Sequence, residues 1–287
     1  LATAENLRRD PPNRLARAVL DAGLLGDPYL MIHNSLGGND KMIITPWRHL
    51  KDKGAIGLDM AVHYSDIVQY YMGPFAQIYG TGWIVEPVRY KPDDSGIKLE
   101  SYVERLKTFP DSIEATGEDS IFAMYKMESG AMVQFNYAGA GRGSGGFERS
   151  VHGRLGALYA PGDRNGNAVI LRLEGRELSG AEILELLPDF QMTEITTRLF
   201  GEKTVTYDLD FPPVDAKHMA IEMHDFADAA LTGGTPEVDG HLGMTAVAAI
   251  YGAYESILAG RAVSMEEVLK GEVYAYQEEI DAAIGLA

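Results

Sequence analysis

The sequence has no cysteine among its 287 residues. Disulfides, thiolate nucleophiles and thiolate metal sites are therefore excluded, and thiols say nothing about the redox compartment. No apolar run approaches the roughly 18 residues of a membrane span, and no charged-then-apolar leader precedes Leu1. These absences predict a soluble, cytoplasmic protein with no membrane partner.

Basic residues are also scarce. The chain has 25 Lys and Arg against 42 Asp and Glu, which gives a net charge of −17. Such a surface repels polyphosphate backbones and anionic lipid, and no stripe of Lys and Arg offsets it. Nucleic-acid binding is therefore not expected, whereas a small neutral or cationic substrate stays compatible with the composition.

Hydrophobic residues make up 46% of the chain and charged residues 23%, which is ordinary for a globular protein. The length allows one large or two modest domains. Apolar periodicity predicts helices near the two ends and strands between them. The predicted helices are 14–22, 57–72, 218–231 and 242–258, and the predicted strands are 29–33, 77–85, 120–127, 131–137, 149–159, 168–173 and 204–209.

Two further stretches, 97–107 and 181–187, interrupt the strands as helices or loops, and residues 34–53 read as a surface loop near a cleft. Ser264 and Glu267 have the spacing of a capping box. Helices, then many strands, then helices indicate an α+β fold with a large, open, mostly antiparallel sheet covered by helices on one face.

The segment from Asp59 to Asp66 is the most informative for chemistry. On a helix, residues four apart are neighbours, so Asp59 is placed to reach and orient His63, with Asp66 one turn later. A histidine held by a carboxylate is suited to general acid–base catalysis near neutral pH. The same spacing also occurs in ordinary surface pairs on helices.

A second motif, Gly141 to Gly146, matches the letters G-x-G-x-x-G of a dinucleotide-binding loop. That loop needs a helix immediately after it, because the helix N-terminus binds the pyrophosphate. The residues that follow alternate with period two, which predicts a strand. We therefore interpret 141–146 as a glycine-rich loop between strands.

The other histidines do not form a recognisable metal motif. His218 and His224 lie six apart, which separates them on a helix, so no helical zinc pair is expected. A metal site built on His63 and Asp59 with a distant residue stays open at this point. Arg8, in a polar cluster that leads into the first helix, has a guanidinium fork suited to substrate hydroxyls or a carboxylate if it faces a cleft.

Four stretches together resemble the Gfo/Idh/MocA oxidoreductases, the glucose–fructose oxidoreductase and inositol dehydrogenase family. Spread in order over nearly the whole chain, they are Ala4–Pro11 with the following helix and Gly23–Gly26, the Trp47-Arg48 pair, the helix Gly57–Asp66, and a C-terminal set made of Glu222–Ala229, Val238–Gly240, Glu255-Ser256 and Gly260–Val263.

The resemblance implies a Rossmann domain followed by an α+β domain whose open sheet often joins subunits. It implies that His63 is the acid–base group toward a substrate hydroxyl with Asp59 beside it, and that Arg8 and Arg48 lie near the substrate. Asp66, one turn after His63 on the predicted helix, is a further candidate for substrate binding. It also implies an NAD or NADP cofactor, a sugar, cyclitol or related polyol as substrate, and a homo-oligomer.

The chain departs from the family pattern at its start. The glycine loop, the ribose-binding acid and the Glu-Lys-Pro lysine of the family are not found in these 287 residues. We therefore expect residues 1–26 to be the last strand and helix of a mostly missing Rossmann domain, and residues 27–287 to be the substrate-binding and oligomerisation domain. The missing half is expected on a longer protein or on a separate nucleotide-binding chain.

Two other functions stay open from the sequence. One is a non-catalytic module that binds ligand and dimerises through its sheet. The other is a cofactor-free or metal-dependent lyase or hydrolase that uses Asp59 and His63 with Asp66.

Overall fold

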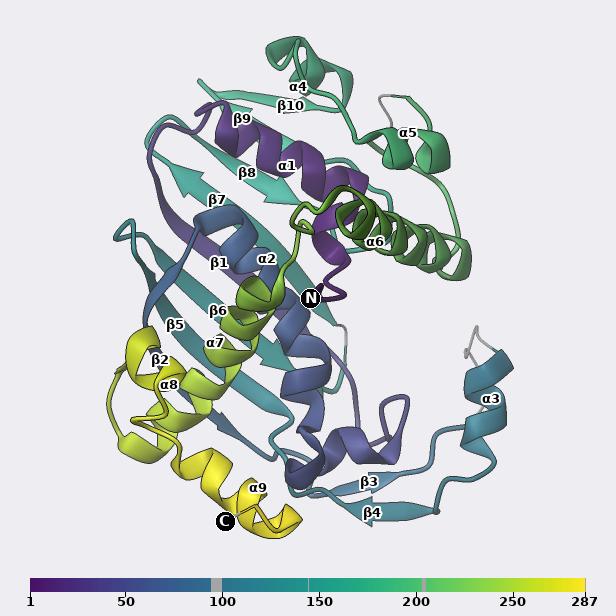
Figure 1. The fold of residues 1–287 in the computed structure, drawn as a ribbon, viewed down its shortest axis with the longest axis vertical. Coiled ribbons are helices and arrows are strands. Elements are labelled where there is room, and N and C mark those ends of the chain that lie inside the picture. Colours follow the sequence, from purple (N-terminus) through teal and green to yellow (C-terminus); the bar gives the residue numbers. More distant parts are fainter. Residues whose placement is uncertain (94–99, 144, 203–204, 287) are drawn as a thin grey trace.

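The computed structural model describes residues 1–93, 100–143, 145–202 and 205–286. Its centre is a nine-stranded sheet in the order β10-β9-β8-β7-β1-β6-β5-β2-β11 (Figure 1). The strands are β1 (Pro28–Leu36), β2 (Phe75–Trp83), β5 (Ser120–Met127), β6 (Met132–Ala138), β7 (Gly146–Gly153), β8 (Gly156–Ala160), β9 (Ile170–Leu173), β10 (Arg176–Ser179) and β11 (Val263–Ser264).

β1 and β6 pair in parallel, and the other neighbouring strands of this sheet pair antiparallel. A separate two-stranded sheet joins β3 (Val88–Tyr90) to β4 (Ser112–Glu114). The predicted α+β fold with a large, mostly antiparallel sheet is therefore confirmed.

Helices α1, α2 and α7 lie across one face of the large sheet (Figure 1). The helices are α1 (Pro11–Asp21), α2 (Val62–Met72), α3 (Glu100–Leu106), α4 (Ala181–Leu186), α5 (Glu194–Phe200), α6 (Phe211–Thr232), α7 (Gly240–Ala259), α8 (Met265–Leu269) and α9 (Ala275–Ile284). Short helical turns add η1 (Leu7–Arg9), η2 (Pro46–His49), η3 (Lys51–Lys53) and the π-helical η4 (Gly57–Ala61).

The core forms between the sheet and these helices because the strands alternate. Tyr125 of β5 and Phe135 of β6 are fully buried on the helix side, while Met124 and Gln134 beside them point to the other face. α7 approaches the sheet at Gly80 of β2, where an added Cβ atom would lie 2.8 Å from Cα of Ala253. A glycine on the strand therefore lets the helix pack closely.

α7 differs from the expectation that no segment is apolar enough to span a membrane. Among the described residues, α7 is long and apolar enough to span a membrane by length and composition alone, but 56% of this apolar stretch is buried inside the protein. It contacts β2 and α2 along its length. This packing is that of a helix in a protein core.

Three element predictions need correction. Residues 149–159 are two strands, β7 and β8, because the chain turns at Arg154 and Leu155 and pairs back on itself. Residues 205–209 form no strand, and Thr204 lies outside the described residues. The helix predicted from Gly57 begins with the π-helical turn η4 and becomes α-helical at Val62.

Of the interrupting stretch 97–107, residues 97–99 lie outside the described residues and α3 covers 100–106. The capping box predicted at Ser264 and Glu267 is confirmed, with both reciprocal hydrogen bonds present. The strand β7 follows the glycine-rich loop directly, as predicted, so no helix N-terminus lies after it to bind a pyrophosphate.

Candidate active site

His63 lies in the first turn of α2, and its side chain is 30% exposed. Its Nδ1 atom lies 2.7 Å from Oε2 of Glu5, a residue buried just before η1. Because a carboxylate can only accept, the ring donates its Nδ1 hydrogen, which leaves Nε2 as the nitrogen that takes up a proton. The structure thus builds a carboxylate–imidazole pair from residues 58 positions apart.

Burial of His63 opposes its charged form, but the hydrogen bond and the charge of Glu5 outweigh burial and raise the pKa of the imidazole. The guanidinium of Arg164 acts in the opposite direction, and the carboxylate of Asp59 adds a smaller increase. The site therefore favours the protonated form of His63 more than water does.

The predicted contact between Asp59 and His63 is wrong. Asp59 lies in η4, where the Val62 N–H donates to the carbonyl of Gly57, five residues back. This wider turn removes the α-helical register in which a residue stacks over its fourth neighbour. Glu5 takes the partner position instead, and Asp59 acts on His63 only through its charge.

Asp59 pairs with Arg48 through both carboxylate oxygens, with Arg48 Nη2 donating to Oδ1 over 2.7 Å and Nε donating to Oδ2. Arg48 Nη1 also donates to the hydroxyl of Thr45 over 2.8 Å, and the guanidinium lies 4.7 Å from the ring centre of Trp47. The predicted cleft loop and the start of the α2 region are therefore joined by one ion pair.

The structure also brings together Arg8 and Asp66, but away from open solvent. Arg8 Nε donates to Asp66 Oδ2 over 2.8 Å, and a second hydrogen bond joins Nη2 to Oδ1. Asp66 is fully buried and also accepts from Gln69 Nε2 over 3.1 Å. In this structure the Asp66 carboxylate holds the N-terminal segment against α2. Its contact with a substrate stays a prediction.

A further acid, Glu222, is buried on α6 and was not predicted as a site residue. Burial and the like charge of Glu5 raise its pKa to about 7, against the lowering effects of Arg9, His63 and Arg164. Neither Glu222 nor Glu5 is recognisable from local spacing, because their partners lie far away in the sequence. The available signals were the dense polar cluster that begins at Glu5 and the family-like stretches Ala4–Pro11 and Glu222–Ala229, which contain the two acids.

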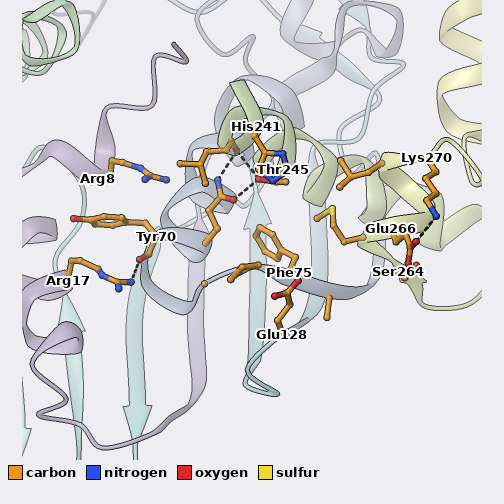
Figure 2. A pocket seen from close by; sticks show the side chains of 17 residues that line it. Arg8, Arg17, Tyr70, Phe75, Glu128, His241, Thr245, Ser264, Glu266 and Lys270 are labelled. Atoms are coloured by element: carbon orange, nitrogen blue, oxygen red, sulfur yellow. Dashed lines mark hydrogen bonds and ion pairs between the residues drawn. The ribbon is translucent and has the colours of Figure 1, made fainter. Parts of the chain in front are cut away.

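A large hollow of about 1050 Å³ lies elsewhere, between α1, the end of α2, the start of α7 and α8 (Figure 2). Its lining mixes apolar side chains such as Phe75 with positive groups that mostly have acidic partners, since Arg8 pairs with Asp66 and Lys270 with Glu266. His63 is not among the residues described as lining it. The hollow is therefore separate from the carboxylate–imidazole pair.

Within the described ranges, no group of three or more His, Asp or Glu side chains is placed to hold a metal ion. These ranges also contain no glycine loop followed by a helix that fits a dinucleotide; Ser144 of the glycine-rich stretch lies outside them.

A comparison with protein-family models matches residues 13–159 to the GFO/IDH/MocA C-terminal domain. The chain belongs to the GFO/IDH/MocA family. The match covers just over half of the chain and includes the η4–α2 segment with Asp59, His63 and Asp66. The resemblance read from the sequence motifs is therefore confirmed. No curated protein matches this GFO/IDH/MocA chain.

Solved structures share its fold. An oxidoreductase from Agrobacterium radiobacter, solved with NAD+, L-tartaric acid and magnesium, is 16% identical with a TM-score of 0.65, and covers 93% of this chain. An NAD-binding oxidoreductase from Klebsiella pneumoniae is 19% identical with a TM-score of 0.66, and covers 91% of this chain. A levoglucosan dehydrogenase solved with NADH and L-sorbose is 17% identical with a TM-score of 0.65, and also covers 91% of this chain. This GFO/IDH/MocA chain spans about 65% of the length of each.

Proposed function

We propose that this chain is the substrate-binding and proton-transfer part of a nicotinamide-dependent oxidoreductase that oxidises or reduces a CH–OH group of a sugar, cyclitol or related polyol. The observation that carries the proposal is the pair of Glu5 and a partly exposed His63. Solved structures of similar fold, which include an oxidoreductase in complex with NAD+ and a levoglucosan dehydrogenase in complex with NADH, support it. In this role Nε2 of His63 takes the proton from the substrate hydroxyl or returns it.

The other predicted site residues have supporting roles in the proposal. Arg48 would bind substrate hydroxyls, held in place by its ion pair with Asp59, whose charge also supports the protonated form of His63. Arg8 is bound to Asp66 and covered, so we propose that it positions the segment that carries Glu5.

The cofactor, NAD or NADP, would be held by a Rossmann domain outside these residues, on a longer protein or on a separate chain. The described residues do not fit a dinucleotide, so no catalytic step of these residues is assigned to it. Residues 1–26 would be the edge of that domain. Substitution of Arg9, which donates to Asp225 of α6 over 2.9 Å, would test how firmly this edge is attached.

Turnover tests the proposal. The chain is assayed with its nucleotide-binding domain, fused or separate, for NAD(P)H formation with a panel of sugars, cyclitols and polyols. His63→Gln should lower turnover by roughly 10²–10⁴-fold, the usual effect of losing a positioned acid–base group. His224→Gln, on the exposed side of α6, is the matched control and should leave turnover unchanged. Equal turnover of both variants would overturn the assignment.

A further inference from the structure

Two consecutive residues in the loop between β8 and β9, Asp163 and Arg164, bind the N-terminal segment at three places. The backbone N–H of Arg164 donates to Oδ2 of Asp10 over 2.9 Å, and its Nη2 atom donates to Oδ1 of Asn6 over 2.7 Å. Asp163 Oδ1 accepts from Nδ2 of Asn13 over 2.9 Å. This loop therefore fixes the path of the chain from the residue after Glu5 into α1.

The backbone of Arg164 is unusual, because its φ of +60° lies in the left-handed region that residues with a side chain rarely adopt. Such a conformation costs free energy and persists where the surroundings fix it. The loop is fixed by Asp163, whose two oxygens each accept from the almost completely buried Arg149 over 2.7 Å. The guanidinium of Arg164 is also held, 3.2 Å from Asp215 and 5.3 Å from the ring centre of Phe211.

The acid of the carboxylate–imidazole pair, Glu5, lies between two anchors of the N-terminal segment. Before it, the N–H of Thr3 donates to the carbonyl of Val238 over 2.9 Å. After it, Asn6 is bound by the guanidinium of the loop. Glu5 is 4% exposed, and its Oε2 atom lies 2.7 Å from Nδ1 of His63. A hydrogen bond of this length is sensitive to the position of the backbone that carries the acceptor.

We propose that Arg164 is a positioning residue for proton transfer. By binding Asn6, it holds the Glu5 carboxylate against the imidazole of His63. The carboxylate keeps the ring hydrogen on Nδ1 and leaves Nε2 as the nitrogen that accepts a proton. The catalytic meaning of this arrangement rests on the proposed function, whereas the tautomer of His63 is a property of this chain.

Nitrogen-15 NMR of the His63 ring tests the proposal without cofactor or turnover. The ring signals are assigned by their loss in His63→Gln and recorded on the alkaline side of the titration, where the ring is neutral. In the unsubstituted chain Nδ1 should carry the hydrogen. Arg164→Asn, whose side chain tolerates a left-handed backbone, should populate the tautomer with the hydrogen on Nε2. Asn6→Ala should do the same while the charge of the chain stays unchanged.

Glu174→Asn is the matched control, because Glu174 also has a left-handed backbone, with φ +50°, but is exposed in the turn between β9 and β10. It should leave the tautomer of His63 unchanged. Retention of the Nδ1 hydrogen in both Arg164→Asn and Asn6→Ala would overturn the proposal. A change in Arg164→Asn alone would overturn it too, because the guanidinium would then act on the ring without Asn6. If Arg164→Asn does not fold, Asn6→Ala decides.

Turnover separates this proposal from the proposed function. In the assay with the nucleotide-binding domain, Arg164→Asn and Asn6→Ala should lower kcat at a nearly unchanged KM, by less than the roughly 10²–10⁴-fold loss expected for His63→Gln. A purely structural brace would affect stability and leave the tautomer of His63 as it is. Unchanged turnover of His63→Gln would refute the proposed function, and the tautomer result would still stand.

Discussion

His63 contributes to stability in a way that depends on pH. Its pKa is raised in the folded chain, chiefly by the hydrogen bond and charge of Glu5 acting against burial. A raised pKa means that the stabilisation is fully present below the unfolded value of about 6.5 and is lost as pH rises through the folded value. His63→Gln should therefore lower the free energy of unfolding more at about pH 6 than at about pH 9.

Urea titrations at the two pH values measure this difference. His224→Gln, whose side chain is exposed, should show no comparable dependence. Equal losses for His63→Gln at both pH values would mean that the Glu5 contact does not favour the charged ring.

The Arg8–Asp66 pair should contribute to stability far more than a surface pair. Both side chains are almost completely buried, so loss of one leaves the other charge without compensation. Asp66→Ala is expected to lower the free energy of unfolding by about 3–5 kcal/mol. Asp21→Ala, which removes the exposed partner of Arg17, should cost less than about 1 kcal/mol in the same urea titration. Similar losses for both would contradict the buried role of Asp66.

At the scale of helices and strands, the contact between β2 and α7 depends on Gly80. A Cβ atom there would lie 2.8 Å from Cα and 2.9 Å from the carbonyl oxygen of Ala253, so the helix backbone would have to move. We expect Gly80→Ala to cost about 1–3 kcal/mol by overpacking. Thermal unfolding measures this loss of stability. Gly146→Ala is the control, because an added Cβ atom at Gly146 meets no atom within 4 Å. An equal loss for the control would contradict the packing argument.

Apolar periodicity was sufficient to predict most elements, because α1 and the strands β5 and β6 each bury one regular set of side chains. α7 instead buries residues on several sides, among them 248–250 and 252–256. It failed where the pattern continued across a turn, as between β7 and β8. Spacing alone also failed at Asp59, because a π-helical turn changes which residues face each other. Local rules assume the regular helix that the chain does not form there.

Across the whole molecule, the site depends on contacts that no local pattern contains. Glu5 and His63 are 58 residues apart. The N-terminal segment reaches several elements in turn, since Arg8 binds α2 and Asn13 Nδ2 donates to Asp163 over 2.9 Å. The sequence could identify His63 as a candidate, but its partners depend on the tertiary fold.

The open face of the sheet suggests how copies of this chain associate. Tyr79 and Trp83 of β2 and Met124 of β5 are large and exposed on the face that α1, α2 and α7 do not cover, and Trp83 stacks on Phe122 with ring centres 5.4 Å apart. A cluster of exposed apolar side chains on a sheet is typical of a protein interface. We therefore expect a homo-oligomer that buries this face.

Light scattering on the purified chain tests this expectation. The double substitution Trp83→Lys with Met124→Lys should reduce the mass to that of one chain, 31.3 kDa, because each copy would bury two charges. Leu186→Lys, on α4 away from this face, should leave the mass unchanged. Each copy carries a net charge of −17, so added salt should strengthen the association by screening repulsion while the apolar contact persists. A single-chain mass for the unsubstituted protein at every salt concentration would rule out the interface.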